Sequence, residues 1–155
     1  MLNEEHGATA VMGSQLAAEQ QDCAFDGIVG FWYGKAPGLD RAGDALRHAV
    51  FTGTSRLGGA VAIVGDDPAA KSSTLPSSSD ATLFDLHMPI LYPGDVQEIL
   101  TLGMHAVSLS RLTGAWTALK VVDAVADGSG TIDLESTIIE PIVPNLEIEG
   151  VQYEH

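Results

Sequence analysis

The apolar run at residues 59–65, GAVAIVG, constrains the fold more than any other segment of this chain. It carries no charge and is rich in β-branched residues, as is typical of a strand buried on both faces of a parallel sheet. Residues 27–33 and 116–122 are similar apolar runs, and residues 89–92 form a shorter one. We therefore expect four strands.

Segments with helical spacing separate these runs. Residues 4–20 place apolar side chains on one face, and two glutamates open the segment, where the helix dipole favours acids. We expect Asp40 to cap a second helix that ends at Gly53. A third follows Asp95, which has capping-box spacing to Glu98.

Strands that alternate with helices predict an α/β fold of three layers, α/β/α, with a mostly parallel sheet. Glycine and proline at residues 34–38, and serine, proline and aspartate at residues 66–80, predict loops. From about residue 128 the chain is acidic and shows no helical period, which indicates a linker or an edge strand.

The composition limits the classes of partner. Acidic residues number 21 against 7 Lys and Arg, and the formal net charge is −14, while 45% of the residues are hydrophobic. The hydrophobic content is enough for a core, and the acidic surface disfavours nucleic acid and anionic lipid. Such an acidic surface is compatible with exposure to solvent or with binding of a basic partner. The sequence has no signal-peptide pattern and no apolar run near ~20 residues, so we expect a cytoplasmic protein without membrane contact.

Metal and hydrolase chemistry have little support. Cys23 is the only cysteine, so the chain alone forms no disulfide and holds no iron–sulfur cluster. No two of the five histidines are four residues apart, and we expect no metal site. Residues 53–58 do not match the G-x-S-x-G pattern of serine hydrolases.

Residues 65–72, GDDPAAKS, nearly match a phosphate-binding loop. Ala70 stands where the second glycine would let the backbone approach phosphate, and Pro68 removes one N–H donor. Asp66 and Asp67 would repel the phosphates. We therefore do not interpret this segment as a nucleotide site.

Two segments are placed where open α/β sheets bind ligands. Trp32 and Tyr33 lie at the end of a predicted strand, next to a glycine-rich turn, and residues 71–79 follow the next strand. The carboxyl ends of parallel strands share one rim of the sheet, so we expect both segments there. The alternatives are ordinary core aromatics and a flexible surface loop.

Six blocks in order resemble the indolepyruvate ferredoxin oxidoreductase family, within the thiamine diphosphate-dependent 2-oxoacid:ferredoxin oxidoreductases. Each block alone is a weak match, but together they cover about residues 3–125. They are NEE (3–5) with ATAV (8–11) and GSQ (13–15), WYGKAPGLDRAGD (32–44), GTSRLGG (53–59), GDDPAAKSSTLP (65–76), PILYP (89–93) with VQE (96–98), and SRLTGAW (110–116).

The resemblance implies the thiamine diphosphate-binding fold and oxidative decarboxylation of an indolepyruvate-like 2-oxoacid. Electrons would pass to iron–sulfur clusters and then to ferredoxin, with release of an acyl-CoA. A family glutamate binds N1′ of the aminopyrimidine and promotes the imino form that removes the C2 proton. Glu4 matches this glutamate, and the remaining cofactor-binding candidates are Trp32, Tyr33, Gly34, Lys71 and Ser72.

The sequence departs from the family pattern at four places. Leu57 and Pro68 stand where the family has histidine, Ser77 and Ser78 replace His-Gln, and Ala36 replaces a glycine. We expect the missing histidines to lie near the rim and to alter the substrate or the turnover.

The resemblance also implies that the chain is a fragment, inactive alone. Residues 1–125 match a pyrimidine-binding domain lacking its upstream strand, and residues 126–155 would be a linker or edge segment. Mg²⁺ and the iron–sulfur clusters would belong to absent domains, and a diphosphate-binding domain or subunit would be the partner in an oligomer. The alternative is a non-catalytic structural or regulatory module that retains the fold.

Overall fold

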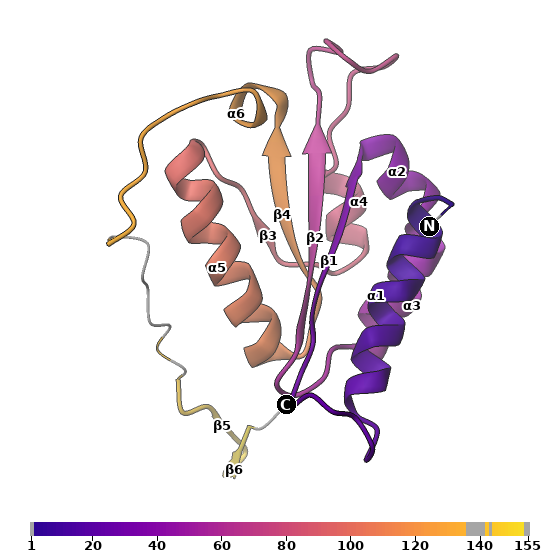
Figure 1. Ribbon diagram of the computed structural model, residues 1–155, viewed down its shortest axis with the longest axis vertical. Helices are drawn as coiled ribbons and strands as arrows, with labels where there is room; N and C mark the ends of the chain where they lie inside the picture. The colour runs from indigo at the N-terminus through magenta and orange to yellow at the C-terminus, as the bar shows by residue number, and fades with distance from the viewer. Residues whose placement is uncertain (1, 136–141, 143, 154–155) are drawn as a thin grey trace.

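The computed structural model describes residues 2–135, 142 and 144–153. Its centre is a four-stranded sheet in which all neighbouring strands are parallel, in the order β1-β2-β4-β3 (Figure 1). The strands are β1 (Val29–Lys35), β2 (Gly59–Asp66), β3 (Ile90–Leu91) and β4 (Thr117–Val122). The predicted parallel sheet is therefore confirmed.

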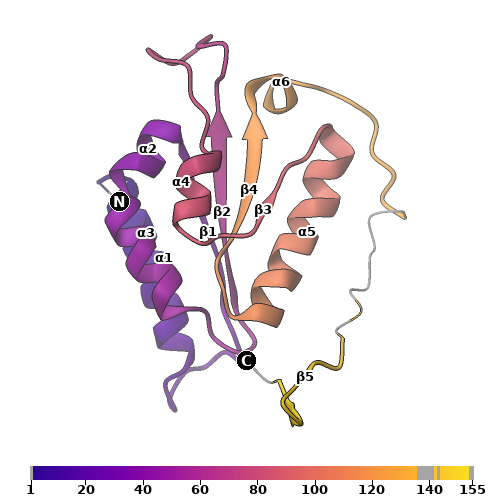
Figure 2. The ribbon, with the colours of Figure 1, turned by 180° about the vertical axis from the view of Figure 1, so that it is seen from behind.

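Helices cover both faces of this sheet, which confirms the predicted three layers. The long helix α5 lies on one face, and α1 to α4 lie on the opposite face (Figures 1 and 2). The helices are α1 (Glu4–Ala18), α2 (Ala36–Arg41), α3 (Gly43–Thr52), α4 (Asp80–Asp85) and α5 (Val96–Thr113), with the short α6 (Asp123–Ala126) after β4.

The alternation of side chains along the strands divides the core in two. Trp32 and Ala62 are buried with the helices α1 to α4, whereas Val61 and Leu119 are buried against α5. Strand β2 is covered on both faces, as its uncharged sequence predicts. Strand β1 is one of the two edge strands, and only one of its faces is buried.

Two helix starts are fixed by capping side chains. The Asn3 side chain accepts a hydrogen bond from the His6 main-chain N–H at 3.0 Å, and Asp95 accepts one from Glu98 at 2.8 Å. The Glu98 carboxylate in turn accepts from the Gly94 N–H at 2.7 Å, one residue before the cap. The predicted cap of the helix after Asp95 is confirmed.

Two local predictions are wrong. Residues 34–38 are not a loop, because β1 continues to Lys35 and α2 begins directly at Ala36. Pro37 is tolerated there because the first helical turn needs no N–H donor at that position. Asp40 is not a cap, since it lies inside α2, and the next helix begins at Gly43.

The C-terminal part is built differently from the sheet. Strands β5 (Glu147–Ile148) and β6 (Val151–Gln152) form a separate antiparallel hairpin, so the described residues there do not extend the main sheet. The division of the chain near residue 125 stays a prediction. Within the described ranges, no helix is long and apolar enough to cross a membrane.

Candidate functional site

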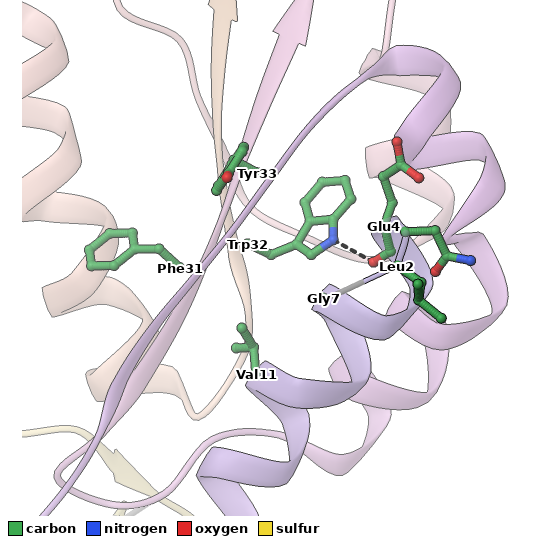
Figure 3. Close-up of a pocket in the computed structure, with 8 residues that line it drawn as sticks. Leu2, Glu4, Gly7, Val11, Phe31, Trp32 and Tyr33 are labelled. Atoms are coloured by element: carbon green, nitrogen blue, oxygen red, sulfur yellow. Dashed lines mark hydrogen bonds between the residues drawn. The ribbon is translucent and has the colours of Figure 1, made fainter.

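A hollow of about 280 Å³ lies between the first turn of α1 and the edge strand β1 (Figure 3). The N-terminal end of α1 lies toward the end of the sheet where the strands finish (Figure 1). The lining residues are Leu2, Asn3, Glu4, Gly7, Val11, Phe31, Trp32 and Tyr33. Glu4, Trp32 and Tyr33, three of the residues that the sequence singles out, therefore meet at one hollow.

Trp32 connects the strand to the helix. The residue is 2% exposed, and its indole N–H donates to the Glu4 main-chain carbonyl at 2.9 Å. Glu4 itself is half-buried, and its carboxylate points away from the indole, toward α2 (Figure 3). The hollow thus combines a partly shielded carboxylate with a fixed aromatic wall.

The aromatic residues on either side of Trp32 point the other way. Phe31 and Tyr33 project from the opposite face of β1, because successive side chains in a strand alternate (Figure 3). Phe31 is 52% exposed and Tyr33 is 80% exposed, and neither belongs to a core cluster. This face of β1 is therefore exposed to solvent at Phe31 and Tyr33.

Gly34 supports the wall without lining the hollow. A Cβ at this position would lie 2.8 Å from Cη2 of Trp32, too close for a real side chain. The glycine predicted as cofactor-binding thus makes room for the indole ring. Its contact with a cofactor stays a prediction.

Lys71 and Ser72 do not line the hollow. Their main-chain N–H groups donate to the Asp67 carboxylate at 2.8 and 2.7 Å. The N–H of Ser72 gives the largest contribution to holding the pKa of Asp67 below its ordinary value, and the N–H of Lys71 adds to it. The Lys71 ammonium lies 3.1 Å from a carboxylate oxygen of Asp123, whose hydrogen bond raises the pKa of Lys71. Their predicted cofactor roles remain predictions.

The loop after β2 is thus organised around a carboxylate instead of a phosphate. Asp67 occupies the two N–H groups that a phosphate would need, which agrees with setting the phosphate-loop interpretation aside. Among the described residues, no group of three or more His, Cys, Asp or Glu could hold a metal ion.

Asp66 has a structural environment of its own. Its side chain is 1% exposed, accepts two hydrogen bonds from Ser79 and lies 3.5 Å from the Lys120 ammonium. Lys120 also binds Asp80 at 2.5 Å. These contacts join the end of β2 to β4 and to the start of α4, which explains why adjacent aspartates occur there.

One departure from the family pattern lies far from the rim. Leu57 precedes β2 and therefore lies at the amino end of the sheet, so the expectation that all the missing histidines cluster near the rim is wrong. Pro68 and the serines at 77 and 78 do follow the carboxyl end of β2. The Asp67 main-chain N–H donates to the Ser77 hydroxyl oxygen at 3.1 Å.

Sequence reasoning missed five of the lining residues: Leu2, Asn3, Gly7, Val11 and Phe31. Asn3 had a recognisable signal, because asparagine before two glutamates is a typical helix cap. Gly7 and Val11 follow Glu4 at helical spacing, so placing Glu4 at a site predicts them as neighbours. Phe31 had no such signal.

The chain is similar to a protein of known identity. It is 30% identical over 118 residues to the indolepyruvate oxidoreductase subunit IorA of Methanothermobacter thermautotrophicus. The match covers 76% of this chain and 19% of that subunit, so the chain spans about a fifth of the length of its relative. No protein-family model matches the chain. The relationship that the six sequence blocks predict is confirmed by this match.

Proposed function

From the chain's relationship to the indolepyruvate oxidoreductase subunits, we propose that it forms the aminopyrimidine-binding part of a thiamine diphosphate-dependent 2-oxoacid:ferredoxin oxidoreductase. The observation that carries the proposal is the position of Glu4. This glutamate lies half-buried in the first turn of α1, in a hollow walled by Trp32. The hollow combines apolar walls with a convergent polar group, as ligand sites do.

The residues present fit the aminopyrimidine in their chemistry. A flat heteroaromatic ring needs an apolar wall and a carboxylate that can share a proton with a ring nitrogen. Leu2, Val11 and Trp32 supply apolar surface, and Glu4 supplies the carboxylate. When bound, thiamine diphosphate supplies the carbanion and electron-sink chemistry at its thiazolium ring.

The chain's own part is to bind the ring and to hold a proton. Glu4 would hold the proton shared with N1′ of the aminopyrimidine, and partial burial strengthens that hydrogen bond relative to water. Trp32 would exclude water from one side of this contact. Tyr33, at the outer margin of the hollow, would close its edge only together with further protein.

The proposal includes a partner domain or subunit that holds the diphosphate. Phe31 and Tyr33 line the hollow but are largely exposed, which supports this assignment because a ligand site normally buries most of its ligand. Mg²⁺ and the iron–sulfur clusters would belong to such partners, and ferredoxin would be reached through them.

Calorimetric titration of thiamine diphosphate and Mg²⁺ into this chain, mixed with a candidate diphosphate-binding partner, tests the proposal. We expect Glu4→Gln to weaken binding by about tenfold or more, the effect of losing one charge-assisted hydrogen bond. Glu5→Gln is the matched control, because this substitution removes the same charge from the same turn. Glu5 is exposed and does not line the hollow. Equal effects of the two substitutions would contradict the role of Glu4.

A second candidate function is a non-catalytic interaction module. The exposed aromatic residues Phe31 and Tyr33, on a strand edge without a neighbour among the described residues, favour this alternative. Absence of cofactor binding with a partner that itself binds this chain would support it. Cofactor binding that depends on Glu4 would exclude it as the only function.

A further inference from the structure

Two glycines accommodate the two side chains of the hollow. A Cβ on Gly38 would lie 2.8 Å from Cγ and 3.1 Å from Oε1 of Glu4, and a Cβ on Gly34 would lie 2.8 Å from the Trp32 ring. Real Cβ atoms essentially never approach other atoms to within 3.0 Å. Each functional side chain of the hollow therefore lies in a space that only a glycine leaves open.

Gly38 occurs where a glycine is otherwise unfavourable. It lies inside α2, and glycine is a weak helix former. Its φ angle is not positive, since the positive-φ glycines are Gly53, Gly59, Gly114 and Gly150, so no special backbone conformation requires it. The packing of the Glu4 side chain is the remaining reason for a glycine at this position.

The main chain of Glu4 is held from a second direction. The first turn of a helix has few hydrogen bonds of its own and frays easily. Here the indole N–H of the buried Trp32 donates to the Glu4 carbonyl, which ties the turn to β1. The same residue is thus fixed at its backbone by Trp32 and limited at its side chain by Gly38.

We propose that Trp32 and Gly38 are positioning residues that fix the Glu4 carboxylate, Trp32 through the main chain of α1 and Gly38 through space for the side chain. The importance of the carboxylate rests on the proposed function, but its placement does not. Gly34 contributes indirectly, because the absence of a side chain there leaves room for the Trp32 ring beside β1.

Gly38→Ala tests the side-chain half of this proposal. We expect the new methyl group to displace the Glu4 side chain, so that nuclear Overhauser effects between the γ-protons of Glu4 and residue 38 change, while helix content is kept. Gly43→Ala is the matched control, because a Cβ there meets nothing within 4 Å. An unchanged Glu4 position in Gly38→Ala would overturn this half.

Removal of the Glu4 side chain separates displacement from general damage. Glu4→Ala removes the Cγ and carboxylate atoms that the new Cβ would meet, so Glu4→Ala combined with Gly38→Ala should show a smaller effect than the sum of the single changes on cofactor affinity. We expect Gly38→Ala alone to weaken thiamine diphosphate binding, in the presence of the partner, by about tenfold. Additive losses in the double variant would contradict direct contact between the two residues.

Trp32→Phe tests the main-chain half. It removes the N–H donor and keeps a ring in the wall. We expect faster amide hydrogen exchange in the first turn of α1 and no change in α5, which packs on the other face of the sheet. Unaltered exchange in that turn would show that the indole does not hold Glu4.

These measurements distinguish the two proposals. If the exchange and the Overhauser effects change as expected but no variant or wild-type chain binds the cofactor, the positioning of Glu4 stands and the proposed function fails. If the cofactor binds through Glu4 but neither structural measurement responds, the positioning proposal is wrong and the proposed function remains.

Discussion

Among the residues that the structure describes, two non-glycine residues outside the C-terminal hairpin adopt left-handed backbone conformations. Ala70 has φ 52° and His87 has φ 60°. His87 follows α4, where the Met88 N–H donates to the Leu83 carbonyl at 3.1 Å and so ends the helix. Ala70 lies in the turn whose next two N–H groups reach the Asp67 carboxylate. Its strained conformation follows from the way that this loop surrounds Asp67.

Replacement of Ala70 by glycine should stabilise the chain. The left-handed conformation costs an alanine about 1–2 kcal/mol, and the greater freedom of an unfolded glycine offsets roughly 0.5–1 kcal/mol of the relief. We expect a net gain of up to about 1 kcal/mol in the free energy of unfolding, measured by chemical denaturation. Ala69→Gly is the control, because its φ is not positive, and it should lower stability. A loss in Ala70→Gly as large as in the control would contradict the argument.

At the scale of secondary-structure elements, a partly buried cluster of charges joins three of them. Lys120 on β4 lies between Asp66 at the end of β2 and Asp80 at the start of α4. Burial alone would lower the pKa of Lys120, but its hydrogen bond to Asp80 and the nearby carboxylates outweigh burial and raise that pKa. The hydrogen bond from Lys120 likewise lowers the pKa of Asp80. Lys120 and Asp80 therefore each favour the charged form of the other.

Lys120→Met should be one of the most damaging single changes in the sheet. It leaves the Asp66 carboxylate, 1% exposed, without its cation, and breaking a buried pair costs roughly 3–5 kcal/mol. Ser79 still donates two hydrogen bonds to the Asp66 carboxylate in this variant, so we expect the loss of stability to lie toward the lower end of that range. Lys35→Met removes the same charge from an exposed position and should cost less than about 1 kcal/mol. The denaturation midpoints of the two variants measure their losses of stability. Equal losses would show that the charge cluster around Lys120 contributes little.

The loop around Asp67 should make stability depend on acid. The pKa of Asp67 is lowered below 3.8 in the folded chain, chiefly by the Ser72 N–H. The unfolded chain therefore binds more protons in this range, so the contribution of Asp67 is present above 3.8 and is lost as the pH falls through the lower folded value. We expect Asp67→Asn to lower the melting temperature at neutral pH.

Below the pH range in which carboxyl groups ordinarily titrate, the melting temperatures of wild type and Asp67→Asn should converge. Melting temperatures recorded from neutral pH to about pH 2 would show this. A constant difference over the whole range would mean that the charge of Asp67 does not stabilise the loop. Asp85→Asn serves as a comparison, because the pKa of Asp85 is lowered by exposed Arg47 and its contribution should be smaller and more sensitive to salt.

For the whole molecule, periodicity predicted the layers but not the details that shape the site. The uncharged run at residues 59–65 could hardly be anything but a central strand, and it is one. Asp40 was misplaced because two short helices follow each other directly, and a capping residue and an early helical residue look alike in sequence. Glu4 was predicted at a site through the family resemblance, and Trp32 through its place at the end of a strand as well as the resemblance. The separation of Lys71 from the hollow could not be predicted, because it depends on hydrogen bonds to Asp67 within the loop.

The molecule as a whole presents one unusual surface. Strand β1 is an edge of the sheet, and its outward face shows Phe31 and Tyr33, while α5 covers β2 and β4 instead. A long apolar edge strand is a template for pairing with another chain. The net charge of −14 opposes association in general, but the outward face of this strand carries no acidic side chain.

We therefore expect the chain, studied alone, to self-associate through β1 as its concentration rises. Phe31→Lys should weaken this association by roughly tenfold, because a charge at the edge disfavours strand pairing. Its effect on stability should be small, since Phe31 is 52% exposed. Phe51→Lys is the control: Phe51 is 94% exposed but lies on α3, so it offers no strand edge. Sedimentation over a range of concentrations measures both variants. An equal reduction by both would assign the association to general exposed hydrophobicity, and an effect of Phe31→Lys alone would assign it to the edge of β1.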